Sequence, residues 1–245
     1  MGITAVGPPN DVIDRLRAEL AALTIANPKL KPFTGLPVMT HAFFPGGNGL
    51  YDGIHATRMP IGGTVILGSN FGCVSKFINA QGKLLIEDER SNPAWKPLLE
   101  NLTLAAIDVR ECFFTNAWPL LHLGESNRGP VRQWLNDPAL MASCVPFFHY
   151  TLAILKPSFI VALGTGPGAF LSHTWPNDLS PWRTYSLKGL DHLPWARVRF
   201  KEQTIVCVVV THPSMHNARR RKPPYQHRAG EIRLLTEARA VVGKK

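Results

Sequence analysis

The chain has 245 residues, and its 27 Lys and Arg against 17 Asp and Glu give a formal net charge of +10. With 45% hydrophobic and 18% charged residues, it can build a core and is too apolar to be disordered. Its densest apolar runs, 159–163 and 205–210, have the length of strands, and its first residues lack the pattern of a secretory signal. We therefore expect a cytoplasmic protein with no membrane partner. The excess of positive charge favours a polyanionic partner.

The four cysteines lie far apart in the sequence, and no two have the C-x-x-C spacing of a zinc or redox site. They are Cys73, Cys112, Cys144 and Cys207. We expect reduced, buried thiols, as is usual in a cytoplasmic protein. The nine histidines include no H-E-x-x-H motif. The sequence therefore predicts no metal and no other cofactor.

The N-terminal part begins with an amphipathic pattern over 10–23, which predicts a helix capped by Asn10 or Asp11. The stretch 28–63 is rich in Gly and Pro and predicts irregular structure packed on the domain. After it, apolar runs typical of strands alternate with segments typical of helices. The predicted strands are 64–67, 109–115, 159–163 and 204–210, and the predicted helices are 94–107, 141–155 and 226–242. We interpret 171–195, which has no clear period, as an insertion.

Buried strands separated by helices predict an α/β fold, a three-layer α/β/α sandwich with a central parallel sheet. We expect one domain over 1–245, with a helix and an irregular extension in 1–62 and the core in 63–245. Ligands of such sheets bind beyond the carboxyl ends of the strands. The four predicted ends are polar or rich in glycine: 68–70, 115–116, 164–166 and 212–214. The glycines of 164–168 do not have dinucleotide-loop spacing and predict a tight strand-to-helix turn.

Four segments at these ends, GSNFG, FFTNAWPL, LKPSFIVALGTGPGAFL and VVVTHPS, resemble in this order the motifs of the uracil-DNA glycosylase superfamily. The resemblance extends from Gly63 to the C-terminus. It implies that family's fold and a monofunctional DNA glycosylase, which flips a nucleotide out of the stack and hydrolyses its N-glycosidic bond. The cysteines do not match the iron–sulfur pattern of other branches, and no lysine in the motifs stands as a Schiff-base nucleophile. The implied partner is double- or single-stranded DNA, bound by a monomer.

The resemblance assigns catalytic roles to Asn70 and His212. Asn70 would place the water that attacks the sugar C1′; an amide cannot take a proton, so the bond would break largely by itself. His212, in His-Pro-Ser, would donate a hydrogen bond to the negatively charged leaving base. Considered alone, an Asn after a strand is an ordinary turn residue and a single His is often structural. The accompanying motifs favour the catalytic roles.

The resemblance assigns base recognition to Asn116, whose amide can pair with a pyrimidine edge in either orientation. Asn116 alone therefore does not distinguish uracil from a cytosine. Phe77 is the nearest aromatic candidate for stacking on the flipped base, although a core role is as consistent with its spacing. Phe71 stands in the first motif where the related branches carry proline.

Gly72 stands where the uracil-specific branch has a tyrosine that walls off the pyrimidine C5 position. The glycine leaves space there, and the aromatic-rich segments 114–134 and 175–195 are expected to line a wider pocket. These features favour a pyrimidine with a C5 substituent, such as a bulky modified cytosine of phage DNA. DNA repair or anti-phage defence would follow, and plain uracil is the alternative substrate.

A basic segment follows His-Pro-Ser where the family has a loop that enters the minor groove. Met215 or His216 would fill the gap left by the flipped nucleotide, and the cations would bind phosphates. The residues expected to contact DNA are Ser214, Met215, His216, Arg219, Arg220, Arg221 and Lys222. Two other classes remain open: a catalytically silent DNA-binding relative, and an enzyme that hydrolyses free nucleotides or nucleosides.

Overall fold

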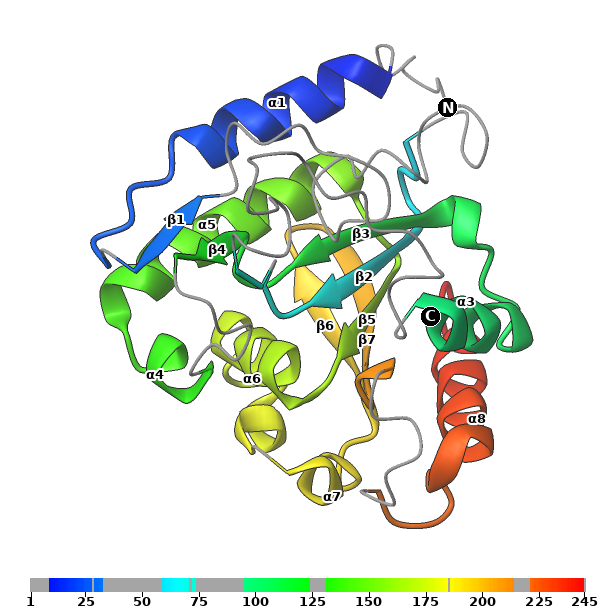
Figure 1. Cartoon of the computed structure of the whole chain (residues 1–245). Helices are drawn as coiled ribbons and strands as arrows, with labels where there is room; N and C mark the ends of the chain where they lie inside the picture. The colour runs from blue at the N-terminus through cyan, green and yellow to red at the C-terminus, as the bar shows by residue number, and fades with distance from the viewer. Residues whose placement is uncertain are drawn as a thin grey trace.

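A five-stranded sheet with the order β3-β2-β5-β7-β6 forms the centre of the computed structural model (Figure 1). The model describes residues 9–27, 29–32, 59–70, 72–73, 95–123, 131–184, 186–213 and 221–244. The strands are β2 (Thr64–Gly68), β3 (Cys112–Asn116), β5 (Phe159–Leu163), β6 (Trp195–Phe200) and β7 (Gln203–Val210). β3, β2, β5 and β7 are parallel, and β6 is antiparallel to β7 at the edge.

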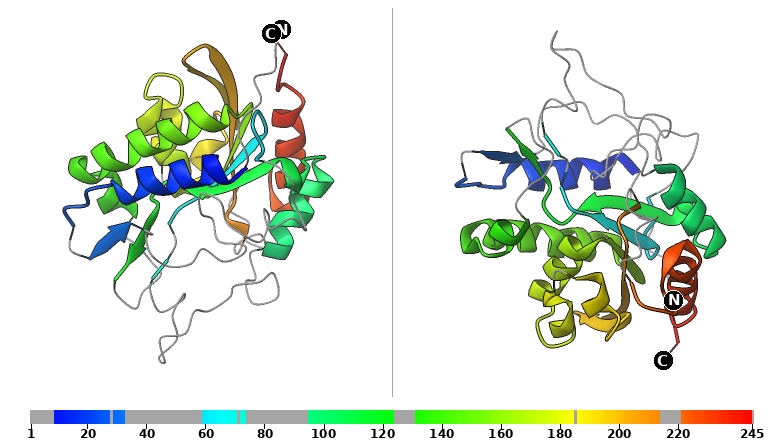
Figure 2. Two further views of the ribbon diagram at one scale, coloured as in Figure 1. Left: turned by 90° about the horizontal axis from the view of Figure 1, so that it is seen from above. Right: turned by 60° about the horizontal axis from the view of Figure 1, so that its bottom comes forward.

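Helices cover both faces of the sheet (Figure 2). They are α1 (Pro9–Ala21), α3 (Trp95–Leu104), α4 (Val131–Leu135), α5 (Pro138–Leu155), α6 (Thr165–Thr174), α7 (Leu187–Leu190) and α8 (His227–Arg239). Along β2, Val65 and Leu67 join the cluster with α1, α5 and α6, whereas Ile66 joins the cluster with α3 and α8. This alternation gives a strand two buried faces, and the predicted three-layer α/β/α fold is confirmed.

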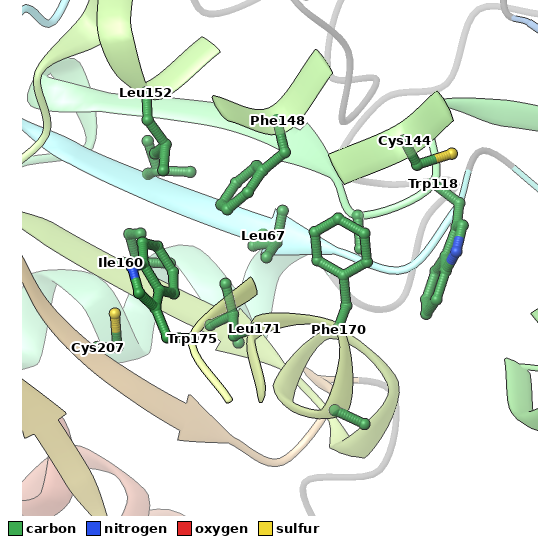
Figure 3. Close-up of a cluster of buried hydrophobic side chains, with 14 of the residues drawn as sticks. Leu67, Trp118, Cys144, Phe148, Leu152, Ile160, Phe170, Leu171, Trp175 and Cys207 are labelled. Atoms are coloured by element: carbon green, nitrogen blue, oxygen red, sulfur yellow. The ribbon is translucent and has the colours of Figure 1, made fainter. Parts of the chain in front are cut away.

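The core between the sheet and helices α5 and α6 is rich in aromatic rings (Figure 3). Phe170 lies with its ring centroid 5.4 Å from those of Trp118 and Phe148, and Trp175 lies 6.3 Å from Phe148. The indole N–H groups of Trp175 and Trp182 donate to backbone carbonyls. The expectation that the aromatics of 175–195 line a pocket is therefore wrong for Trp175 and Trp182, which are buried core residues.

Helix α5 starts three residues before the predicted helix, because Asp137 caps it. The Asp137 carboxylate accepts from the Leu140 N–H at 3.0 Å, and Pro138 occupies the first turn. Helix α5, with 18 residues, is long and apolar enough to cross a membrane by length and composition. The apolar runs of the sequence did not indicate this. The helix nevertheless contributes eight buried residues to the fold, as the core helix of a globular domain does.

Several boundaries differ from the predictions for local reasons. Helix α1 begins at Pro9, so Asn10 and Asp11 lie inside it. Residues 109–111 form a 3-10 turn (Val109–Glu111) before β3, because the Asp108 carboxylate accepts from the Arg110 N–H at 3.0 Å. A second short 3-10 helix, Ser180–Arg183, lies between α6 and α7.

Three of the described strands, β1, β4 and β6, were not predicted. β1 (Leu30–Pro32) pairs antiparallel with β4 (Leu120–His122), and it lies in the stretch predicted to be irregular (Figure 1). β6 begins at the last residue of the predicted insertion; its buried Ala196 and Val198 alternate with exposed Arg197 and Arg199. Charges on the outer side of an edge strand oppose pairing with other chains.

All four cysteines are buried thiols, in agreement with the sequence prediction. Burial raises the pKa of the Cys144 thiol to about 12 and raises the pKa values of Cys112 and Cys207 as well. These three thiols therefore stay protonated and unreactive near neutral pH.

Candidate active site

The carboxyl ends of the four parallel strands lie along one edge of the sheet, as predicted. In the register of the sheet, Gly68 of β2 pairs with Asn116 of β3, and Leu163 of β5 pairs with Val210 of β7. β5 lies between β2 and β7. The segments that begin at these four residues therefore meet at the same edge.

The segments that follow β2 and β3 continue to pair beyond the sheet. The Ala117 N–H donates to the Gly68 carbonyl at 2.9 Å, and the Trp118 N–H donates to the Ser69 carbonyl at 2.9 Å. Since Trp118 is fully buried, its ring fixes this junction to the core. Asn70, the next residue after Ser69, is thereby held on the segment beside Asn116.

Asn70 carries an unsatisfied amide at this edge. The residue is half-buried, but its Nδ2 atom is buried and has no hydrogen-bond partner among the described residues. The Oγ1 atom of Thr115, the neighbour of Asn116, is in the same condition. An unpartnered buried polar group costs about 1–3 kcal/mol, so such groups call for an explanation in function. A ligand or an ordered water at this edge would satisfy the Asn70 amide.

Asn116 ends β3 and is only 3% exposed. It lies directly opposite Gly68, which has no side chain to cover it. Buried polar residues at strand ends of α/β sheets are well placed for ligand recognition.

Gly72 adopts a left-handed backbone conformation, with φ at +83°. Its carbonyl accepts from the His122 N–H at 2.8 Å, and the next residue, Cys73, forms a parallel bridge with His122. A positive φ is by itself a reason for glycine at this position. The absence of a side chain therefore has a backbone cause in addition to the space it leaves.

A cavity of about 560 Å³ lies beside the ribbon of β1 and β4. Its lining residues are Ala26, Asn27, Lys29, Leu30, His122, Gln133, Trp134 and Asp137. Since His122 also holds the Gly72 carbonyl, one wall of the cavity is in direct contact with the loop of the first motif. Of the Phe and Trp residues in the aromatic-rich stretch 114–134, Trp134 lines this cavity, whereas Phe114 and Trp118 are buried in the core.

His212 follows β7 by two residues. Burial lowers its pKa, so its imidazole is neutral at neutral pH and still carries one N–H donor. Gly164 lies beside it: the Gly164 N–H donates to the Val210 carbonyl at 2.8 Å, and a methyl group at Gly164 would lie 3.6 Å from Cβ of His212. Gly164 has φ at +94° and starts α6 directly. The predicted tight turn is confirmed, and it brings α6 close to His212.

Behind His212, the carboxylate of Glu231 on α8 is buried against the end of β7. It accepts the Thr211 N–H at 3.1 Å and also the Thr211 hydroxyl. Burial raises the pKa of Glu231, and the neighbouring Arg221 opposes this shift. Two donors from Thr211 and a guanidinium are the partners of an ionised carboxylate.

Arg221 points into the protein and not into solvent. Its side chain is 1% exposed; its Nε donates to Asp191 at 2.9 Å, and its Nη1 donates to the Val209 carbonyl at 2.7 Å. The expectation that Arg221 binds phosphate is therefore wrong, because the residue is an internal anchor. Lys222 is exposed, and its backbone N–H donates to Asp191 at 2.8 Å. Its ammonium group remains available for phosphate contact.

A comparison of the sequence with protein-family models identifies the family. The model of the uracil DNA glycosylase superfamily matches residues 27–234. The chain belongs to this superfamily. No curated protein matches the chain. Members of the uracil DNA glycosylase superfamily are in general DNA glycosylases, hydrolases that act on DNA. The match starts well before Gly63, where the sequence motifs begin, and so includes β1 and its pairing with β4.

Seven of the predicted site residues lie outside the described residues. They are Phe71, Phe77, Ser214, Met215, His216, Arg219 and Arg220. In the part of the chain that the structure describes, no group of three His, Cys, Asp or Glu is placed to hold a metal ion. The absence of a metal and of a cofactor stays a prediction.

Sequence reasoning did not find Glu231, Asp191 and the role of Arg221. Glu231 lies within a helix of mixed polarity, and Asp191 lies in a turn after α7. Nothing in their sequence neighbourhoods separates them from solvent-exposed acids. Their contacts with Thr211 and Arg221, which lie far from them in the sequence, identify them.

Proposed function

We propose that this member of the uracil DNA glycosylase superfamily is a monofunctional glycosylase that flips a pyrimidine nucleotide out of DNA and hydrolyses its N-glycosidic bond. The observation that carries the proposal is the placement of Asn70 and His212 at the ends of β2 and β7, with only β5 between them. Two strand spacings separate these ends by about 10 Å. A nucleoside in this gap would have Asn70 on one side and His212 on the other.

Asn70 would act on the water. Its buried and unpartnered Nδ2 and the carbonyl on the same amide can together hold a water molecule or the sugar in one orientation. Because an amide takes no proton, the glycosidic bond breaks largely before water attacks. The water then adds to an oxocarbenium-like sugar. Asn70 thereby contributes orientation and not general-base catalysis.

His212 would act on the departing base. Bond cleavage leaves negative charge on the base, and the neutral imidazole donates its N–H to the carbonyl oxygen that carries this charge. The lowered pKa of His212 keeps this donor neutral in the resting enzyme. Removal of one such donor typically costs about 100-fold or more in rate.

Asn116 would read the base, since its amide lies buried at the end of β3, next to the segment that carries Asn70. Gly72 and the adjacent cavity support a substrate with a C5 substituent. The Gly72 carbonyl is bonded to His122, and His122 lines the cavity of about 560 Å³, which offers room for a bulky group. A C5-modified pyrimidine is therefore the proposed substrate, with uracil as the alternative.

The net charge of +10 and the exposed Lys222 support DNA as the polymer that is bound. Ser214, Met215, His216, Arg219 and Arg220, which follow His212 in the sequence, are proposed to contact the same DNA. The protein would act as a monomer in the cytoplasm, in DNA repair or in defence against phage with modified bases.

The experiment is an abasic-site assay on duplex and single-stranded oligonucleotides that carry uracil or a C5-modified cytosine. The proposal expects alkali-labile sites in at least one modified DNA. A silent DNA-binding relative would retain the DNA in a gel shift and produce no abasic site. An enzyme for free nucleosides would cleave them as well as DNA, and its rate would not depend on salt.

A further inference from the structure

We propose that Glu231 is a positioning residue that fixes His212 by holding both ends of the segment between Thr211 and Arg221. This inference rests on the catalytic role proposed for His212. It assigns a function to a buried carboxylate that touches none of the reacting atoms in the mechanism above.

The first end of the segment is Thr211, which is bonded directly to His212 in the chain. Glu231 uses both carboxylate oxygens on Thr211: Oε2 accepts the backbone N–H at 3.1 Å, and Oε1 accepts the hydroxyl. A contact to the backbone N–H fixes the peptide itself. The Thr211 N–H belongs to the peptide between Val210 and Thr211, so this contact fixes the backbone one residue before His212.

The second end is Arg221, which follows Arg219 and Arg220 in the chain. Its Nε lies 4.0 Å from Oε1 of Glu231, and its remaining bonds go to Asp191 and to the Val209 carbonyl. Val209 lies in β7, twelve residues before Arg221, so this bond ties Arg221 to the strand that precedes His212. Glu231 thus contacts both the exit and the return of this segment.

The helix that carries Glu231 is itself fixed. Leu234, Leu235 and Ala238 of α8 are at most 2% exposed and pack in the same cluster as Val208 and Val210 of β7. A carboxylate buried at such a place is costly unless its partners compensate it. Among the described residues, the compensation comes from Thr211 and Arg221, the two ends of the segment that bears His212.

The first test measures amide hydrogen exchange at position 211 and does not require activity. Glu231→Ala removes both acceptors, and we expect exchange there to become about tenfold faster or more, because a hydrogen bond to a charged group is lost. Glu231→Gln can still accept the N–H and should recover part of the protection. Glu100→Ala removes an ion pair to Arg228 of the same helix α8 and is the control, with no change expected. Unchanged exchange in Glu231→Ala would overturn the proposal.

The second test is a double-mutant cycle on single-turnover base release at saturating DNA. If Glu231 acts through His212, Glu231→Ala should lower the rate about tenfold or more in the wild type and have no further effect in His212→Ala. An equal loss in both backgrounds would show a merely structural role and overturn the proposal. A rate loss that disappears at higher DNA concentration would also overturn the proposal, because it would reflect weaker DNA binding.

Thr211→Val keeps the shape of the residue and the charge of Glu231 but removes the hydroxyl donor. If Glu231→Ala does not fold, both measurements are made on Thr211→Val. We then expect a smaller loss of exchange protection and a smaller loss of rate, in the same direction. No change in either measurement would overturn the proposal. If the wild type releases no base from any DNA, the proposed function fails, and the exchange measurement alone still decides whether Glu231 holds the segment.

Discussion

The N–H of Trp118 donates to the carbonyl of Ser69 at 2.9 Å, and this bond joins two segments that are almost fifty residues apart in the chain. Trp118 is fully buried, with its ring centroid 5.5 Å from that of Trp134. The core therefore sets the position of the backbone that leads into Asn70. A site that must orient water needs such a rigid support.

Replacement of His212 by alanine should slow base release about 100-fold or more, because the leaving base loses its hydrogen-bond donor. DNA affinity should stay within a factor of a few, since the imidazole does not need to bind phosphate. The measurement is the single-turnover rate at saturating DNA together with a binding titration. Wild-type rates from a folded variant would remove His212 from the mechanism.

Asn70→Ala should abolish most of the activity without loss of stability. The substitution removes a buried amide nitrogen that has no partner among the described residues, and such a group costs about 1–3 kcal/mol. Urea unfolding should therefore give an equal or higher midpoint, while base release falls and DNA binding persists. A lower midpoint would mean that Asn70 is a structural turn residue.

Arg221 and Lys222 should respond in opposite ways although they are neighbours. Arg221→Ala leaves Asp191 and Glu231 without their buried cation and should cost about 3–5 kcal/mol of unfolding free energy. Lys222→Ala should change stability by less than about 0.5 kcal/mol. If Lys222 binds phosphate, its loss should also reduce the slope of log affinity against log salt by about one. The idea fails if Arg221→Ala is as stable as Lys222→Ala.

Stability should fall as the pH drops below the ordinary histidine pKa of 6.5, in part because of His212. The folded protein lowers the pKa of His212, so between the two pKa values the unfolded chain binds more protons, and acid favours unfolding. His149 and His173 shift in the same direction by burial. His212→Ala should therefore lose less stability than the wild type between pH 7.5 and 5.5 in urea titrations. Glu231 shifts in the opposite direction in both proteins and cancels in the comparison. An equal loss would place His212 in a solvated environment.

The C5 pocket is best tested from the cavity side, because a large residue at Gly72 would be strained by the positive φ. Gln133 is exposed on α4 and lines the cavity, so Gln133→Trp should fill space there without breaking the core. Release of a bulky C5-modified cytosine should fall about tenfold or more relative to uracil, by direct overlap with the new indole. Lys188→Trp, on α7 and away from the cavity lining, is the control. An unchanged ratio would place the C5 substituent elsewhere.

The sequence was sufficient for the layers of the fold and for the edge where the site lies. β5 has the predicted bounds because a continuous apolar run is closed by Lys156-Pro157 before it and by Gly164 after it. Asn70 and His212 could be placed because ligands of parallel sheets bind beyond the carboxyl ends. β6 was missed because it alternates apolar residues with arginine, next to a stretch without a period.

The role of Arg221 could not be read from its neighbours. In sequence it belongs to a run of four cations, and such runs usually face solvent. Its burial depends on Asp191, which lies 30 residues before it, and on Glu231, which lies on the helix that follows it. Contacts between distant segments of this kind appear only when the packing of α8 on the sheet is known.

The most direct measurement of the central claim is mass spectrometry of free bases after incubation with a panel of duplex DNAs that carry uracil or C5-substituted pyrimidines. The account predicts that the wild type releases an intact pyrimidine base, with the C5-modified substrate preferred, and leaves an abasic site without strand cleavage. His212→Ala and Asn70→Ala should release little or none under the same conditions. Absence of any free base from every DNA of the panel, with a folded protein that binds DNA, would contradict the account.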